Sequence, residues 1–215
     1  MAELAFECVD VAPERYGVAP TMIFKLRIAE ATGVRVDAIA LRVQMRIDPV
    51  RRQYADREAK LCRDVFGDRS RWGETLKPMQ FAHAAVMVPT FTGSVEVDVP
   101  VPISYDLEVA TGKFLHALNF DGDPVAVTLL FSGMVFERGD TGFSVTNVPW
   151  HAETTYRLPP SVWRDLMDQY FPDSGWLRLR RETLDELVTY KSAHGYATWE
   201  ETIIALVRRS AEVAR

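Results

Sequence analysis

"TMIFKLRIAE", residues 21–30, alternates between a mainly apolar set and a mixed set of side chains. Lys25 and Arg27 fall in one alternate set. The other set contains four large apolar residues: Met22, Phe24, Leu26 and Ile28. Because successive side chains of a β-strand point to opposite faces of its sheet, this pattern predicts a strand with one buried and one solvent-facing side. The segment therefore favours a fold built on a half-buried β-sheet.

The same alternation returns in three further segments, which cover residues 39–47, 95–109 and 125–137. A Thr32-Gly33 turn separates the first of them from residues 21–30. Two alternating segments joined by a turn that contains glycine are typical of neighbouring strands. We therefore expect these two strands to form an antiparallel pair with one face in water.

Two of the segments contain signs of irregular strands. Pro100 and Pro102 cannot donate ladder hydrogen bonds, so they predict an edge or a break in the strand that holds them. In residues 125–137 the apolar residues change phase at Ser132-Gly133. We expect a β-bulge at Gly133 as the cause of this change.

The last third of the chain has a helical period instead. Residues 162–171 carry an apolar stripe at helical spacing, formed by Val162, Trp163, Leu166, Met167, Tyr170 and Phe171. A second helix is expected over residues 181–193. A third is expected to begin at a reciprocal capping box between Thr198 and Glu201. One further helix, over about residues 53–66, is expected between the strands.

Many short strands without crossover helices favour antiparallel sheets over a parallel α/β fold. We therefore expect an α+β fold with an antiparallel β-sandwich-like body, an inserted helix and a C-terminal helical subdomain. Residues 1–158 form the β-rich body in this interpretation. Residues 159–215 form the helical subdomain, which packs on the body to give a single globular unit.

The composition narrows the classes of function. The formal net charge of -5 argues against a general nucleic-acid-binding protein, which is expected to be basic. No apolar run reaches the roughly 18 residues of a membrane-spanning helix, and the first residues lack a signal-peptide pattern, so we expect a cytoplasmic protein. Cys8, Cys62 and the four histidines show no metal-ligand spacing, which predicts two reduced thiols, no bound metal and no cofactor.

The joint between the strands and the helical part is the first candidate site. Its aromatic and ionisable side chains are Trp150, His151, Glu153, Tyr156, Arg157 and Trp163. His151 and Glu153 are suited to act as a general base and its orienting group, since alternate residues of a strand share a face. Alternatively, the aromatic side chains seal the interface between sheet and helix, with His151 at its edge. The second interpretation needs only packing, whereas no nucleophile or metal accompanies the first.

A local excess of positive charge is the second candidate site. Residues 41–71 contain nine Lys or Arg and five Asp or Glu. If Arg42, Arg46 and Arg52 converge on one surface, they attract an acidic partner and make its binding sensitive to salt. Local neutralisation by the acidic residues of the same segment is the alternative.

Several segments together resemble a family of uncharacterised bacterial proteins, mainly from actinobacteria. They include "IALRVQMRIDPVRRQY", "LLFSGMVFE" and "VPWHAETTYRLPPSVWRDLMDQYFPDSGWLRL". Members of that family are often encoded near uptake nickel-iron hydrogenases. The resemblance therefore implies an accessory role, with a hydrogenase or its maturation machinery as the partner. It supplies no catalytic residues.

Two functions of different classes remain open. The first is a non-catalytic adaptor or chaperone-like protein that binds a protein partner, for instance in hydrogenase assembly. The alternative is a small-molecule enzyme whose pocket lies at the sheet–helix junction around His151. A homo-oligomer is compatible with both. A closed pocket that holds a histidine favours the enzyme, whereas an open aromatic groove favours the adaptor.

Overall fold

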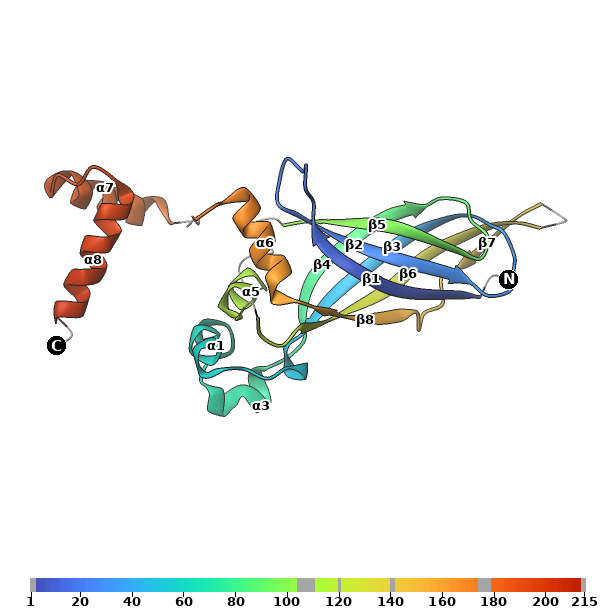
Figure 1. Cartoon of the computed structure of the whole chain (residues 1–215), viewed down its shortest axis with the longest axis horizontal. Helices are drawn as coiled ribbons and strands as arrows, with labels where there is room; N and C mark the ends of the chain where they lie inside the picture. The colour runs from blue at the N-terminus through green and yellow to red at the C-terminus, as the bar shows by residue number, and fades with distance from the viewer. Residues whose placement is uncertain (1–2, 104–110, 120, 140–141, 174–178, 214–215) are drawn as a thin grey trace. The chain divides into compact units, whose positions relative to one another are not determined.

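The computed structural model describes residues 3–103, 111–119, 121–139, 142–173 and 179–213 (Figure 1). The chain divides into two compact units, Met1–Asp173 and Ser174–Arg215. The first unit is a β body with short helices, and the second is a pair of helices.

The β body contains two antiparallel sheets. The three-stranded sheet has the order β1-β2-β5 and is built from Leu4–Pro13, Thr21–Glu30 and Ser94–Pro102. The five-stranded sheet has the order β4-β3-β6-β7, and β8 pairs with β6 beside β7. Its strands β3, β4, β6, β7 and β8 are Val36–Asp48, Met79–Val88, Val125–Gly139, Gly142–Asn147 and Glu153–Leu158. The expected α+β fold with antiparallel sheets is confirmed.

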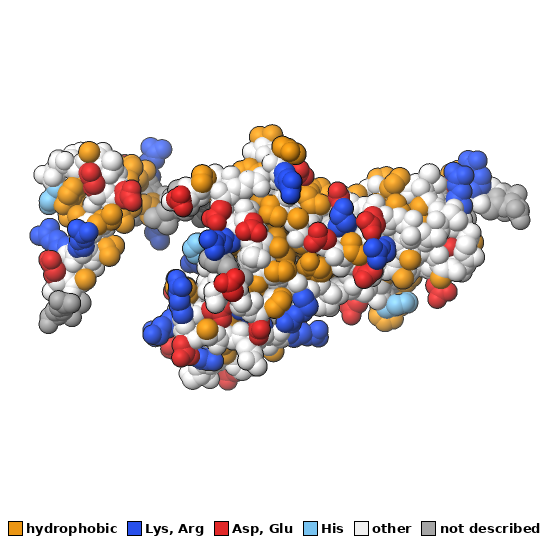
Figure 2. All heavy atoms as spheres, in the orientation of Figure 1, with side chains coloured by type: hydrophobic (Ala, Val, Ile, Leu, Met, Phe, Trp, Pro, Cys, Tyr) orange, Lys and Arg blue, Asp and Glu red, His pale blue; other side chains and the backbone are white. Residues whose placement is uncertain are grey.

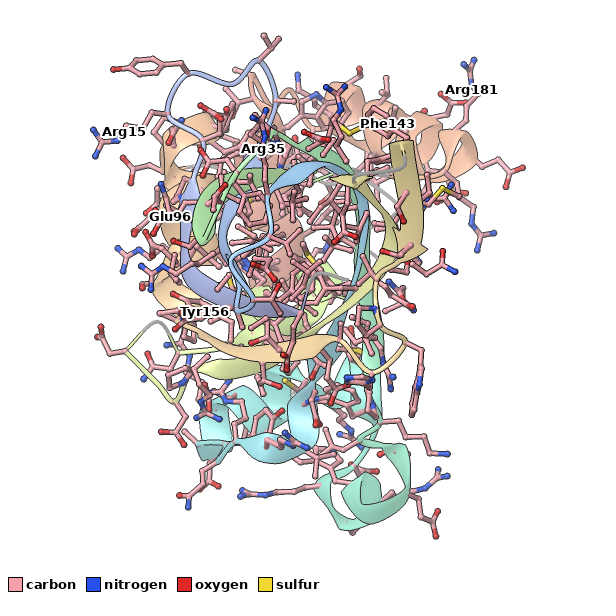
Figure 3. All side chains as sticks on the ribbon, turned by 90° about the vertical axis from the view of Figure 1, so that its right-hand side faces the viewer. Arg15, Arg35, Glu96, Phe143, Tyr156 and Arg181 are labelled. Atoms are coloured by element: carbon pink, nitrogen blue, oxygen red, sulfur yellow. The ribbon has the colours of Figure 1, made fainter. Side chains whose placement is uncertain are left out.

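The apolar faces of the two sheets enclose one core. The inward side chains of β2 are fully buried, as are those of β3: Ile39, Leu41, Val43, Met45 and Ile47. Phe6 of β1 stacks on Phe131 of β6 with ring centroids 4.4 Å apart, which joins the sheets directly. Figure 3 shows the strands surrounding these packed side chains. The half-buried strand predicted over residues 21–30 is confirmed.

The expected pairing of β2 with β3 is wrong. β2 pairs with β1 and β5, whereas β3 pairs with β4 and β6. The two strands lie in opposite sheets because each has one apolar face, and both faces are buried when the sheets pack against each other. Pro100 and Pro102 lie on β5, an edge strand that pairs only with β2 among the described strands, so the predicted edge is confirmed.

The expected β-bulge at Gly133 is also wrong. The register of β3 with β6 runs without a shift through Leu41 and Gly133. Gly133 has a φ of 144°, and a Cβ there would collide with the carbonyl oxygen of Ala40. The apparent change of phase arises because Met134 and Phe136 are apolar residues on the outward side of β6. Glu137, by contrast, is buried on the inward side.

Short helices gather at one end of the two sheets (Figure 1). They are η1 (Pro49–Arg51), α1 (Asp56–Leu61), α2 (Arg63–Phe66), η2 (Arg69–Arg71), α3 (Trp72–Thr75), α5 (Lys113–Ala117) and α6 (Pro160–Tyr170). Tyr54 meets Trp72 edge-on at 4.9 Å between centroids, and Phe66 meets Phe114 at 5.6 Å. Such edge-to-face pairs stabilise an apolar cluster, and here they hold the inserted helices together.

Helix α6 packs on the β body within the first unit. Trp163 and Leu166 of its apolar stripe are buried, and α6 contacts β1 and α5. The hydroxyl of Tyr170 donates to the carbonyl oxygen of Gly17 at 2.8 Å. The packing of residues 174–215 on the body, expected for the whole helical subdomain, stays a prediction.

The second unit consists of α7 (Arg181–Ala193) and α8 (Trp199–Val213). The capping box at the start of α8 is confirmed: the Glu201 amide donates to the Thr198 hydroxyl at 3.1 Å, and the Thr198 amide donates to the Glu201 carboxylate at 3.3 Å. His194 lies 4.1 Å from the ring of Tyr190 and stacks on Tyr196 at 5.8 Å, between centroids. Within the described ranges, no helix is long and apolar enough to cross a bilayer.

Candidate functional site

The side of the five-stranded sheet that faces away from the core carries the predicted basic residues of β3. Arg42 and Arg46 alternate with buried residues and are exposed. The register places Arg42 beside Ala85 of β4 and Ser132 of β6, and places Arg46 beside Thr128 of β6. In the described part of the chain, neither arginine forms an ion pair with a carboxylate. Both guanidinium groups are therefore available to an external anion.

Large apolar side chains lie on the same side of this sheet. Met87, Met134, Phe143 and Val145 are 64%, 52%, 63% and 55% exposed. Ala40 of β3 is opposite both Met87 of β4 and Met134 of β6, so it joins the two methionines in one row. We call this surface the outer-face patch, and it comprises Ala40, Arg42, Met87, Met134, Phe143 and Val145.

The outer-face patch is open and shallow. Small side chains at Ala40 and Ala85 leave a depression of about 240 Å³ between Arg42 and Met87. The guanidinium of Arg138 covers the ring of Phe143 at 5.4 Å. Small-molecule sites are usually concave and enclose most of the ligand. An open apolar surface with arginines beside it suits a protein partner better.

Arg52 is not part of this surface, contrary to expectation. Its side chain is 1% exposed and its Nη2 donates to Glu58 Oε1 at 2.8 Å. The same oxygen accepts from the amide of Asn119 at 2.7 Å, and Glu58 Oε2 accepts from the amide of Ala55 at 2.8 Å. The chain turns into the helical cluster after Pro49, which takes Arg52 off the sheet. Glu58 therefore joins α1 to Arg52 before it and to the segment after α5.

The residues of the predicted junction groove are dispersed. Glu153 and Arg157 face outward on β8, and the Arg157 guanidinium donates to the carbonyl oxygen of Arg51 at 3.0 Å. Tyr156 pairs with Val127 on the inward side, where burial raises the pKa of its phenol. Trp163 is buried in α6 beyond the end of β8. Strand alternation thus places Tyr156 on the opposite face from Glu153 and Arg157, so these side chains do not line one pocket.

Trp150 and His151 lie in the turn that joins β7 to β8. Trp150 is 93% exposed and meets the His151 ring edge-on at 5.6 Å between centroids. The amide of Val148 donates to the carbonyl oxygen of Gly133 at 3.0 Å, so this turn leaves the sheet next to Met134. His151 is exposed. The two rings contact each other at an exposed turn.

The cysteines are buried and free. Burial raises the pKa of Cys8 to about 12 and that of Cys62 to about 11. A thiol with so high a pKa is almost entirely protonated at neutral pH and is a poor nucleophile. Among the described residues, no group of three or more His, Cys, Asp or Glu side chains is placed to hold a metal ion.

The sequence contained a sign of the outer-face patch, but its periodicity suggested a change of phase within one strand. Met134 and Phe136 stand on the outward register of β6, and this was the feature that imitated a change of phase. Phe143 and Val145 continue the apolar surface on β7, a strand that the alternation did not predict. Apolar residues on both registers of one strand are thus the sequence sign of a second, exposed apolar face.

Comparison with known proteins assigns a family and leaves the activity open. No curated protein matches this sequence. A family model described as "Family of unknown function (DUF6084)" matches residues 1–215, which include both the β body and the helical unit. The chain therefore belongs to that family.

Proposed function

We propose that this protein is a non-catalytic adaptor or chaperone-like accessory protein, and that the outer-face patch binds its protein partner. One observation carries the proposal. Four large apolar side chains, each more than half exposed, share the solvent side of a sheet whose central strands, β3 and β6, bury their side chains on the other side. Exposed apolar surface of this kind is uncommon on proteins without partners and typically marks an interaction site.

The chemistry of the patch suggests the kind of partner. Methionine side chains adapt to irregular apolar surfaces, so Met87 and Met134 suit a partner with a hydrophobic contact region. Arg42 lies two residues along β3 from Ala40, which is opposite both methionines, and Arg46 lies farther along the same face; neither arginine has an acidic partner in the described chain. Exposed positive charges next to an apolar contact favour a partner with acidic groups around its own hydrophobic area.

The family resemblance supplies a first candidate. It implies an uptake nickel-iron hydrogenase or its maturation machinery, and hence a role in the cytoplasm during enzyme assembly. The buried, unpaired thiols accord with a reducing compartment. Because Arg42 and Arg46 are positively charged, the contact surface of any candidate partner must carry acidic side chains.

Affinity capture from the native host tests the proposal. The variant Met87→Glu with Met134→Glu places two carboxylates on the patch and should lose a partner that the wild type retains. The matched control is Val18→Glu with Leu61→Glu, because these apolar residues are 105% and 52% exposed and lie outside the patch. Quantitative mass spectrometry measures recovery. Equal recovery with both double variants would rule out the patch as the binding surface.

A further inference from the structure

The helical unit carries an apolar face that its own two helices do not cover. On α8, Trp199, Ile203, Ile204 and Val207 are 42%, 44%, 43% and 61% exposed. On α7, Leu184 and Val188 are 42% and 44% exposed. Spacings of three and four residues place these side chains along one side of each helix. Figure 2 shows apolar side chains between charged ones on this unit.

Two short helices alone give this unit little stability. α7 has 13 residues, none of them buried, and α8 has 15. Isolated helices of about 12 to 15 residues are marginal in water. Thr202 is the one buried residue in the described part of the unit. Stable helices of this length need a further surface against which the apolar face can pack.

The charges beside the face of α8 are complementary to a second copy of the same helix. Glu200 and Glu201 lie near its N-terminal end, and Arg208 and Arg209 lie near its C-terminal end. If two α8 helices cross antiparallel with Ile204 at the centre, Glu200 of each copy lies opposite Arg208 of the other. A parallel crossing would instead place like charges together. The sequence of α8 is thus self-complementary in the antiparallel sense that a two-fold interface requires.

We propose that the protein forms a homodimer in which α7 and α8 of two copies pack as an antiparallel four-helix bundle. The shared contact consists of Leu184, Val188, Trp199, Ile203, Ile204 and Val207. Opposite charges at Glu200 and Arg208 set the direction of crossing. Four helices around one apolar core are a common stable arrangement, whereas two helices leave half of that core in water.

The area of the apolar face indicates the protein concentrations at which the dimer should form. Helices of this length extend about 20 Å and pack about 8 to 10 Å apart. The face therefore measures roughly 20 by 20 Å in projection, on the order of 400 Å² for each copy, below the roughly 800 Å² of a standard interface. We accordingly expect dissociation within the micromolar range.

Sedimentation velocity of the full chain from about 1 to 100 µM tests the dimer. The wild type should shift with concentration from the 24.4 kDa monomer to twice that mass. Ile204→Glu buries a carboxylate at the centre of the contact and should weaken association by about 100-fold or more. Thr189→Glu is the matched control, since it adds the same charge to an exposed position on α7 away from the apolar side, and should dimerise normally.

A charge exchange tests the direction of crossing independently. Glu200→Arg and Arg208→Glu should each weaken the dimer, and the double variant should restore it, because the opposite charges again face each other. Circular dichroism checks that each variant remains helical. A wild type that stays monomeric at 100 µM overturns the proposal, as does an Ile204→Glu variant that still dimerises. Failure of the double variant to recover overturns the antiparallel arrangement.

Discussion

Helices α6 and α8 carry the same kind of apolar stripe but differ in what covers it. In α6, Trp163 is 4% exposed and Leu166 is fully buried against the β body. In α8, Ile203 and Val207 are 44% and 61% exposed. The difference teaches that an amphipathic pattern specifies a helix with a face to bury and does not specify the surface that buries it. The stripe of α6 is covered by the β body, whereas that of α8 is left uncovered within its own unit.

Replacing the tryptophan in the apolar stripe of each helix with alanine should give the largest difference in stability between α6 and α8. Trp163→Ala should lower the free energy of unfolding by about 3 to 5 kcal/mol, because it leaves a cavity in the core. Trp199→Ala should lower it by about 1 kcal/mol or less at concentrations where the chain is monomeric, since Trp199 is 42% exposed and contacts Lys191 through its ring. Urea denaturation measures both. Equal losses would contradict the contrast between the helices.

The buried ion pair should contribute far more than exposed pairs of similar geometry. Glu58→Gln leaves the buried guanidinium of Arg52 without a counter-charge and should cost about 3 kcal/mol. Asp68→Asn removes the exposed partner of Arg63, 3.0 Å away, and should cost about 1 kcal/mol or less. The midpoints of urea unfolding at constant slope compare the two. A similar small loss in both variants would show that Glu58 is not needed to hold α1 in place.

The sequence predicted the faces of the elements better than their neighbours. Alternation identified β2, β3 and the first part of β6, because a half-buried strand imposes a period of two. It missed β1, where the register with β2 shifts between Cys8 and Asp10 and breaks that period. It also paired β2 with β3, since periodicity shows which side of a strand is buried and contains nothing about the strand beside it.

The same limit explains the predictions of the candidate sites: the sequence shows which face of a strand a residue lies on, but not which residues lie next to it in space. Arg42 and Arg46 were placed on an exposed face because their strand alternates. Arg52 was grouped with them from local charge alone, and a count of charges cannot detect that a side chain turns inward to meet Glu58. The junction residues were close in sequence, but an extended strand of six residues separates its ends by roughly 20 Å. Proximity along a strand is therefore weak evidence for a shared pocket.

Charge reversal on the sheet should change binding and leave folding intact. Arg42→Glu with Arg46→Glu should alter the free energy of unfolding by less than about 0.5 kcal/mol for each substitution, because both side chains are exposed. Recovery of an acidic partner should fall, and the salt dependence of the remaining binding should become weaker. Binding measured at two salt concentrations tests this. Unchanged recovery and salt dependence would remove these arginines from the interface.

Acid stability of the β body should depend on a carboxylate at the end of β2. The Glu30 carboxylate accepts hydrogen bonds from the Thr32 hydroxyl and amide and from the Glu3 amide. These bonds, that from the Thr32 hydroxyl first, lower the pKa of Glu30 to about 2. Because the folded-state pKa is below the unfolded value of about 4.3, the charged form stabilises the fold. This contribution is fully present above the unfolded pKa and is lost as the pH falls toward 2.

Glu30→Gln isolates the effect from the other carboxylates of the chain. The wild type should be more stable than this variant at pH 6, and the difference should shrink as the pH falls from about 4.3 toward 2, where Glu30 itself becomes neutral. Urea unfolding of both proteins at matched pH values measures the difference. Thr32→Ala should reduce the same difference, since it removes the strongest of the bonds to the carboxylate. A difference that does not change between pH 6 and pH 3 would contradict the assignment, because a contact that depends on shape alone is insensitive to the charge of Glu30.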